Sequence, residues 1–345
     1  MAASGRVTLH DVARESGVSK SSVSNVIRNH PHVRDEVRAR VEAAIERLGY
    51  RPQAIGQNLV SGRTGLIALA IPNFAQPYFA EFARAVVAAA GVRGTRLLVQ
   101  QTDNDLERER EVADAWSLGA ADGLIFSPSS ITDEEIERRR AGMPLVLLGE
   151  RSKLVTVDRV GIDSVEIARL ATAHLIDRGR TRIAMIGDKD FGDRFVVSER
   201  QEGYRRALEA AGLSPAAEVQ GVQDWTREDG VAAMEGLLDR GDRIDAVFCA
   251  NDLLALGALA ALRRRGVRVP DDVAVIGIDD IEEASYSSPS LSTVMIDRTW
   301  MAEQAIRLLL TRLDDSEVAP QQLTVPHALR VRESTGGSVV RSDGS

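Results

Sequence analysis

The sequence Thr8-Leu9-His10-Asp11-Val12-Ala13 decides how the start of this chain folds, together with Gly17-Val18-Ser19 and Val23-Ser24-Asn25. The Thr8 hydroxyl can accept a hydrogen bond at a helix start, and an acid lies three residues further on. Gly17 tolerates the left-handed conformation of a tight turn, and Ser19 can cap a second helix. That helix would turn Val23 inward and expose small polar and basic side chains. The pattern predicts a helix-turn-helix, a motif that binds the DNA major groove.

A third helix and a proline-led segment follow. Apolar residues recur on one stripe over 37–48, and Gly49 ends this helix. The stripe can close a small core over the first two helices. Pro52, which suits a first helical turn, begins another short segment. We therefore expect a helical head at 1–51 and a hinge helix at 52–63.

The order and spacing of several separate segments carry a family resemblance. These segments are Thr8–Ala13, Gly17–Ser19, Val23-Ser24, Leu48-Gly49-Tyr50, Pro52 and Gln57-Asn58-Leu59. With them the chain resembles the LacI (lac-repressor-like) family of bacterial transcription regulators. The resemblance continues through Ala250-Asn251-Asp252 and Gly277-Ile278-Asp279-Asp280, and it covers about residues 7–333. It implies an effector-binding core related to periplasmic sugar-binding proteins.

The charge of the chain is divided unevenly. The 345 residues carry a net charge of −8, which by itself argues against a nucleic-acid partner. Residues 1–63, however, hold ten Lys/Arg against six Asp/Glu, a net +4, which leaves −12 on the remainder. A basic head on an acidic body is expected when the head alone contacts phosphates.

Composition and motifs argue against several classes of protein. Cys249 is the single cysteine, so no intramolecular disulfide is expected, and no Cys/His cluster suggests zinc. We find neither a secretory signal nor an apolar run long enough to span a bilayer. We therefore expect a cytoplasmic protein without a metal, a cofactor or a membrane partner. The five histidines form no acid–base set, and P-loop, G-x-G-x-x-G and G-x-S-x-G motifs are missing, so no catalytic residue is expected.

From Leu66 onward, short apolar runs alternate with helical stretches. The expected strands are Leu66–Ile71, Leu97–Gln101, Gly123–Phe126, Leu145–Leu148, Ile183–Ile186, Ala246–Cys249 and Val273–Ile278. Continuous apolar strands between amphipathic helices indicate parallel sheets that are covered on both faces. The expected fold is an all-α helix-turn-helix head plus an α/β core of two doubly wound parallel-sheet subdomains.

The long connection between Leu148 and Ile183 indicates where one subdomain passes into the other. The last segments fit as chain that crosses back between the two. The expected divisions are 64–160 with 293–322 for the N-subdomain, 161–292 with 323–333 for the C-subdomain, and 334–345 for a disordered tail.

Polar residues follow the expected strands, where such sheets bind ligands, and would converge on a cleft between the subdomains. That Asn251 and Asp279 only cap the following helices is equally open. The strand ends and the family resemblance together give the effector candidates Asn73, Tyr78, Phe79, Ser127, Arg194, Arg200, Trp225, Asn251 and Asp279. Trp225 could instead be a core aromatic, Arg194 a surface residue, and Arg200 a partner of Glu199 or Glu202.

Guanidinium, amide and carboxylate groups can form hydrogen bonds with the hydroxyls of a polyhydroxylated ligand, and aromatic faces pack against its ring C–H groups. A sugar or sugar derivative is therefore the expected effector. A purine nucleobase is the alternative, because both ligand classes occur among relatives.

The resemblance assigns DNA contacts to the head and the hinge. Lys20, Ser21 and Asn25 would face base edges, where Asn can bond adenine and Lys can reach guanine. The expected phosphate and hinge contacts are Thr8, Ser19, Ser22, Ser24, Arg28, Asn29, His32, Ile55, Gly56 and Leu59. Leu59 would wedge into the minor groove and kink the duplex. Gly56 lowers helix stability, so we expect the hinge to order only on DNA.

These features predict a DNA-binding transcriptional regulator, acting as a repressor, whose operator affinity responds to a small effector in the cleft. Two hinges meeting at one site require a homodimer, with a tetramer as the alternative, on a near-palindromic operator. The competing classes are a secreted solute-binding protein, an enzyme and an architectural DNA binder. The missing export signal opposes the first, and the missing catalytic motifs oppose the second.

Overall fold

The structure is a computed structural model that describes residues 7–27, 30, 32–50, 64–115, 121–139, 142–150, 152–187, 195–217, 219–222, 224–241 and 243–337. The chain divides into two compact units, Met1–Gly65 and Leu66–Ser345. We call them the head and the core. Within the described residues, no helix combines the length and the apolar character needed to cross a membrane.

The head contains α1 (Leu9–Ser16), α2 (Lys20–Ile27) and α3 (Asp35–Leu48). Its apolar core consists of Val12, Ala13, Val23, Val26, Val41, Ala44 and Tyr50. Thr8 and Asp11 form a capping box at the start of α1. Gly17 makes the turn into α2 at a φ of 63°, and a Cβ there would meet an Arg40 nitrogen at 2.7 Å. Because Arg40 on α3 also donates to the Ser16 carbonyl at 2.5 Å, the third helix ties down this turn.

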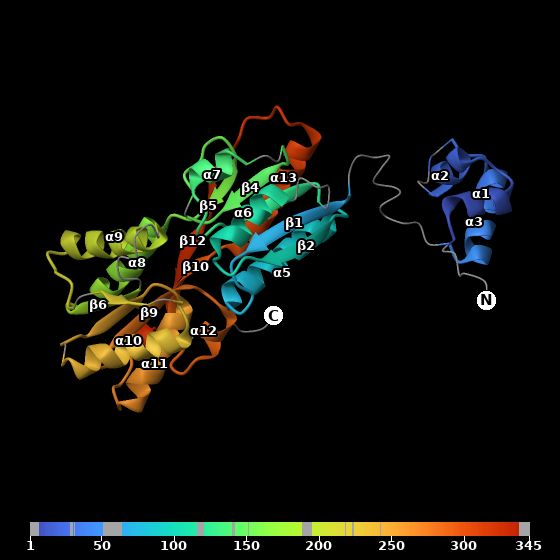
Figure 1. Cartoon of the computed structure of the whole chain (residues 1–345). Coiled ribbons are helices and arrows are strands. Elements are labelled where there is room, and N and C mark those ends of the chain that lie inside the picture. Colours follow the sequence, from blue (N-terminus) through green and yellow to red (C-terminus); the bar gives the residue numbers. More distant parts are fainter. Residues whose placement is uncertain are drawn as a thin grey trace. The chain divides into compact units, whose positions relative to one another are not determined.

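The first lobe of the core is a parallel sheet of order β11-β5-β4-β3-β1-β2 with helices on both faces (Figure 1). Its elements are β1 (Leu66–Ile71), α5 (Pro77–Val92), β2 (Arg96–Gln101), α6 (Leu106–Ala115), β3 (Gly123–Phe126), α7 (Asp133–Glu137), β4 (Leu145–Leu148), β5 (Asp158–Gly161), α13 (Arg298–Asp314) and β11 (Gln322–Thr324). Ile67 and Leu69 of β1 belong to the same apolar cluster as Phe82 of α5, whereas Ala68 packs in a second cluster with Val112 of α6. Burial on both faces explains why the strand is continuously apolar.

The second lobe repeats this design with the sheet order β12-β10-β9-β8-β6-β7. Its elements are α8 (Ser164–Asp177), β6 (Ile183–Gly187), α9 (Phe195–Ala210), β7 (Gln220–Gly221), α10 (Arg227–Asp239), β8 (Ala246–Cys249), α11 (Asp252–Arg264), β9 (Ala274–Asp279), α12 (Glu282–Tyr286), β10 (Ser292–Ile296), β12 (His327–Arg330) and the 3₁₀ turn η2 (Glu333–Thr335). The strands are parallel except β12, which pairs antiparallel with β10 at the edge.

The chain crosses between the lobes three times, after β5, after β10 and after β11. Neighbouring crossings are hydrogen-bonded. The Val325 amide donates to the Gly161 carbonyl at 2.8 Å, and the Asp297 amide donates to the Pro326 carbonyl at 3.0 Å. These bonds bring three distant stretches of sequence together as one hinge between the lobes.

Three expectations from the sequence need correction. The connection from Leu148 to Ile183 contains a strand, β5, which completes the first sheet before the chain crosses. Residues 293–322 were expected in the N-subdomain and 323–333 in the C-subdomain, but β10 pairs with β9 in the second sheet, while α13 packs on the first sheet and β11, which includes Leu323 and Thr324, pairs with β5 there. The tail was expected to begin at 334, yet Ser334 is buried and its hydroxyl donates to the Val275 carbonyl at 2.6 Å. Residues 338–345 lie outside the described part of the chain.

Candidate DNA-binding surface and effector cavity

Helix α2 presents the expected polar surface. Val23 and Val26 point into the head core, so the opposite side of the helix is free. Lys20, Ser21 and Asn25 are exposed there. They are the three side chains expected to face base edges.

The expected phosphate contacts that can be placed lie around the same helix. Ser19 is exposed and its hydroxyl accepts from the Ser22 amide at 3.1 Å, so it caps α2. Thr8 is exposed and serves in the capping box of α1. Ser24 is half-buried and His32 is exposed. Of the other candidates, Arg28, Asn29, Ile55, Gly56, Leu59 and Arg194 lie outside the described residues.

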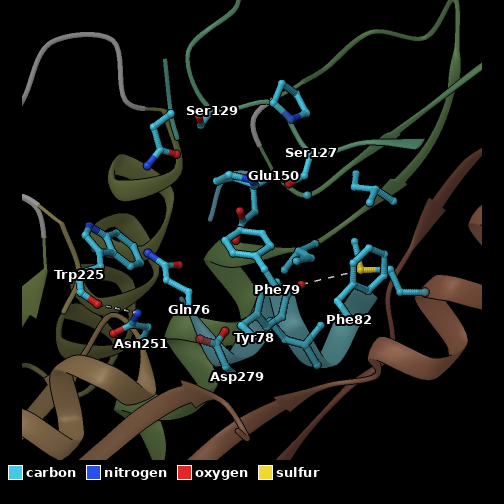
Figure 2. A pocket seen from close by; sticks show the side chains of 18 of the residues that line it. Gln76, Tyr78, Phe79, Phe82, Ser127, Ser129, Glu150, Trp225, Asn251 and Asp279 are labelled. Carbon is cyan, nitrogen blue, oxygen red and sulfur yellow. Dashed lines mark hydrogen bonds between the residues drawn. The ribbon is translucent and has the colours of Figure 1, made fainter. Parts of the chain in front are cut away.

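A cavity of about 360 Å³ lies between the two lobes, where strands of both sheets end. Its walls come from α5, α9 and α13, from the loops after β1, β2, β3, β4, β7 and β8, and from the ends of β9 and β10. Seven of the effector candidates line it: Tyr78, Phe79, Ser127, Arg200, Trp225, Asn251 and Asp279. Figure 2 shows Trp225 and Asn251 on one side of the cavity and the α5 aromatics beneath it. Asn73 is not in the lining; its Oδ1 accepts from the Ala75 amide at 2.8 Å and shapes the turn before α5.

Arg200 is the centre of a buried polar network. Its guanidinium pairs with Glu150 at 2.7 Å and donates to the Ala250 carbonyl. Ser164 Oγ donates to the same Glu150 carboxylate at 2.6 Å. The ion pair links α9 of the second lobe to the end of β4 in the first. A buried pair with additional hydrogen bonds fixes the geometry of both groups.

The alternative pairing of Arg200 with its sequence neighbours is wrong. Glu199 pairs with Lys153 at 2.7 Å, and Glu202 pairs with Arg206 at 2.6 Å on the exposed side of α9. The Arg200 guanidinium lies 5.1 Å from the centre of the Trp225 ring. Trp225 is therefore an aromatic wall of the cavity, held by a cation–π contact.

Asn251 serves the fold and the cavity together. Its Oδ1 accepts from the Leu254 amide at 2.9 Å and caps α11, while its Nδ2 donates to the Trp225 carbonyl at 3.4 Å. The second bond holds Trp225, whose φ of 60° is unusual for a residue other than glycine. The sequence left open whether Asn251 lies at the cleft or caps the following helix, and in the structure it does both.

Asp279 places a carboxylate at the cavity wall. Its φ of 117°, followed by a φ of 55° at Asp280, is a conformation that costs about 1–3 kcal/mol per residue. Burial raises the pKa of Asp279 to about 7, although Arg200 and Arg298 pull it in the opposite direction. Among the described residues, no donor bonds to its carboxylate. An acidic group held without a partner, in a strained conformation, is poised to accept from a ligand.

The aromatic floor comes from one turn of α5. Tyr78 and Phe79 meet edge to face with ring centres 5.2 Å apart. The Tyr78 hydroxyl contacts Met301 Sδ at 3.8 Å, and burial raises the pKa of this tyrosine. The pair supplies an apolar surface with one polar edge.

Several lining residues were not among the effector candidates. They are Gln76, Asp103, Asn104, Ser129, Ser130, Glu150 and Asp224. Gln76, Asp103 and Glu150 follow expected strands, so the strand-end rule marked their position but not their role. Ser129 and Ser130 reach the cavity because the buried Glu109 carboxylate accepts from both of their amides, at 2.9 and 2.8 Å. No pattern along the chain signals that contact.

The head and the hinged, cavity-bearing core define a class, the ligand-responsive DNA-binding regulators. Comparison with known proteins agrees with that class. Residues 8–53 match the bacterial regulatory proteins of the lacI family, and residues 172–335 match the periplasmic binding protein-like domain. The HTH-type transcriptional regulator CelR of Thermobifida fusca is 34% identical over 95% of this chain and 98% of its own length.

Two solved structures are similar across nearly the whole length. A CelR–cellobiose complex has a TM-score of 0.69 at 35% identity and covers 95% of this chain and 100% of its own. A lac repressor dimer bound to operator and the anti-inducer ONPF has a TM-score of 0.85 at 27% identity, covering 96% and 99%. The chain belongs to the LacI family of bacterial transcription regulators, and it is a DNA-binding regulator rather than an enzyme.

Proposed function

We propose that this regulator is a repressor that binds a near-palindromic operator as a homodimer. Its affinity for the operator would fall or rise when an uncharged sugar occupies the cavity. The head would read bases with Lys20, Ser21 and Asn25, which are exposed on one side of α2. The hinge at 52–63 would complete the DNA interface. Operators of this kind are in the bacterial cytoplasm, which is the location that we propose.

The cavity supports a polyhydroxylated ligand. Asp279 offers an unpaired acceptor, and Asn251 and Arg200 add polar groups on the same wall. Trp225, which lies next to Asn251 and Arg200, adds a ring that can pack against sugar C–H groups. The Asp279 carboxylate, which lines the same cavity as this ring and accepts no hydrogen bond from the described residues, is the observation that carries the proposal. Relatives that bind sugars, such as CelR with cellobiose, agree with it.

The charge of the lining favours a neutral ligand over a phosphorylated or carboxylated one. Glu150 is neutralised by Arg200, and Asp103 by Arg108, which leaves Asp224 and Asp279 as the acids without an ion pair among the described lining residues. Residues 188–194 hold three acids and two bases in sequence, so they add no net positive charge. An anion would enter a negative field in a region of low dielectric, which is unfavourable.

A thermal-shift panel on the full-length protein tests this proposal. The probes are cellobiose, ribose and glucose, with glucose 6-phosphate and glucuronate as anionic counterparts and hypoxanthine and guanine as nucleobases. We expect a rise in Tm with a neutral sugar, no rise with the anions, and loss of the sugar response in Asp279→Ala. A response to a nucleobase alone would instead make this a purine-controlled regulator.

An operator titration then tests control. Operator DNA selected from a random pool should bind the full-length protein, and the sugar that raised Tm should change the affinity by 5- to 150-fold, a typical allosteric coupling. Unchanged affinity with a bound sugar would favour an architectural role. The direction of the change distinguishes induction from corepression.

The dimer face that we propose lies on α5 and the edge strand β2, which pack side by side (Figure 1). Val87, Val92 and Leu98 are exposed there by 53%, 85% and 41%. Exposed apolar side chains on a helix and an unpaired strand edge fit a second copy across a two-fold axis. The solved lac repressor dimer supports this assembly. Val87→Asp should yield monomers in sedimentation, whereas the exposed Glu111→Lys on α6 should leave the dimer intact.

A further inference from the structure

Arg298 stands where the lobes, the hinge and the cavity meet. It is the first residue of α13, directly after the crossing that leaves β10. Its side chain is 15% exposed and reaches both lobes. Towards the second lobe, the guanidinium donates to the carbonyl of Asp279 and, at 2.9 Å, to the carbonyl of Asp280.

The same guanidinium contacts α5 in the first lobe. Arg298 Nη2 lies 2.7 Å from Glu81 Oε2, and its Cζ lies 5.7 Å from the centre of the Tyr78 ring. The other oxygen of Glu81 accepts from the Glu282 amide at 3.0 Å, at the start of α12 in the second lobe. Glu81 and Arg298 therefore form two links across the lobes, one through each side chain.

These contacts fall on the strained turn of the cavity. Asp279 and Asp280 have consecutive positive φ angles, and Arg298 holds the carbonyls of both. The Asp280 carboxylate is held away from the cavity by Arg332 at 2.6 Å, so only Asp279 faces the ligand space. The two Nη atoms of a guanidinium can donate to successive carbonyls and so fix such a turn. A lysine has a single nitrogen and lacks this planar fork.

We propose that Arg298 and Glu81 are positioning residues: they form a clamp that joins the lobes behind the cavity and holds the Asp279 carboxylate towards the effector. The effector part of this inference rests on the proposed function. Because Glu81 and Tyr78 lie on α5, the helix of the proposed dimer face, the clamp also connects the cavity to that face. When the lobes close, the ion pair between Arg298 and Glu81 would transmit the movement to α5.

Amide hydrogen exchange of the full-length protein, without ligand or DNA, tests the clamp. The variants are Arg298→Met, Arg298→Lys and Glu81→Gln, and the matched control is Glu202→Gln, which breaks an ion pair within α9. We expect exchange of peptides spanning 279–286 to rise about tenfold in Arg298→Met, because the turn loses the guanidinium that bonds its two carbonyls and Glu81 loses the ion pair that positions it for the Glu282 amide. Arg298→Lys should recover only part of the protection.

Glu81→Gln should raise exchange at the start of α12 with less effect on the preceding turn, since it leaves the Arg298 bonds to the two carbonyls. Unchanged exchange of 279–286 in Arg298→Met would overturn the proposal. So would an equal rise over β6 and β8, which would indicate general destabilisation rather than a local clamp. Circular dichroism establishes that each variant folds.

A second measurement concerns the ligand. Cellobiose affinity should fall about tenfold in Arg298→Met, and Arg298→Met should cause little further loss in an Asp279→Ala protein, because both changes act on one carboxylate. Fully additive losses would contradict the positioning role. If cellobiose does not bind the wild-type protein, this sugar is wrong as the effector, while the exchange experiment still decides whether the clamp exists.

Discussion

At the scale of single residues, neighbours in sequence take separate roles. Asn251 lines the cavity and caps α11, whereas the adjacent Asp252 is fully buried and accepts from the Ile281 amide and the Thr293 hydroxyl at 3.0 and 2.7 Å. Burial raises the pKa of Asp252, as it does for Asp279. Only Asp279 borders the cavity, so a ligand can reach only one of these two unusual acids.

The raised pKa of Asp279 predicts a pH-dependent stability. Because this pKa moves from 3.8 to about 7 on folding, the native protein keeps a proton between these values that the unfolded chain releases. Stability from this group is therefore greatest below pH 3.8 and declines as pH rises to about 7. Asp279→Asn cannot ionise, so its Tm should exceed the wild-type Tm by about 2–4 °C at pH 8 and by less at pH 5. Equal differences at the two pH values would contradict the assignment.

Lys20 predicts a change in DNA selectivity. Because its side chain is exposed on α2, where we propose that it faces bases, Lys20→Ala should weaken binding to the preferred operator by about 1–3 kcal/mol and relax one base preference. Arg28→Ala, which we expect to remove a phosphate contact, should weaken all sequences alike and reduce the salt dependence. Arg47→Ala, which breaks an exposed pair with Glu15, is the control. Binding to a randomised operator library checks all three variants.

At the scale of elements, one carboxylate organises a wall of the cavity. Glu109 on α6 is fully buried and accepts from the amides of Ser129, Ser130 and Ile131, and from the Ser129 hydroxyl. The loop after β3 therefore wraps around a side chain from another element. A carboxylate can accept all of these bonds, whereas an amide group would turn an NH₂ towards some of the donors.

Glu109→Gln should consequently lower stability by about 1–3 kcal/mol, because a buried hydrogen-bond donor loses its acceptor. The loss should concentrate at the loop 127–131, where amide exchange should accelerate, and sugar affinity should weaken with it. Glu107→Gln, which alters an exposed neighbour on α6, is the matched control. A Glu109→Gln protein with unchanged exchange in this loop would disprove the role.

At the scale of the whole molecule, the head and the core are separate compact units with opposite charge. The described residues of the head form an apolar cluster of their own. DNA binding and ligand binding are therefore expected to be separable. We expect the coupling between them to use the proposed hinge at 52–63.

Removal of residues 1–63 tests this separation. The remaining chain should keep its sugar-induced rise in Tm and its dimeric state, because the cavity and the proposed dimer face lie within the core. Its operator affinity should fall by at least about 10³-fold, to the level of non-specific binding or below. Retained operator binding in an electrophoretic assay would place the DNA interface elsewhere.

The sequence by itself determined which type of fold each part of the chain adopts. Capping residues, the turn at Gly17 and the apolar stripe defined the head, because these signals are local. Continuous apolar strands such as Leu66–Ile71 defined parallel sheets, because both faces of each strand must be buried. The strand-end rule also located the cavity, since the carboxyl ends of parallel strands share one edge.

The tertiary structure decided which lobe each late segment joins and which polar residues meet. Ser292–Ile296 reads as a strand in sequence, but only hydrogen bonding with β9 assigns it to the second sheet. Glu150 and Arg200 are fifty residues apart, and Glu81 and Arg298 more than two hundred, so no local pattern marks either pair. The first pair joins the two lobes and the second joins α5 to α13 within the first lobe, so both depend on how the chain crosses the hinge, and that path is set by packing of the complete core.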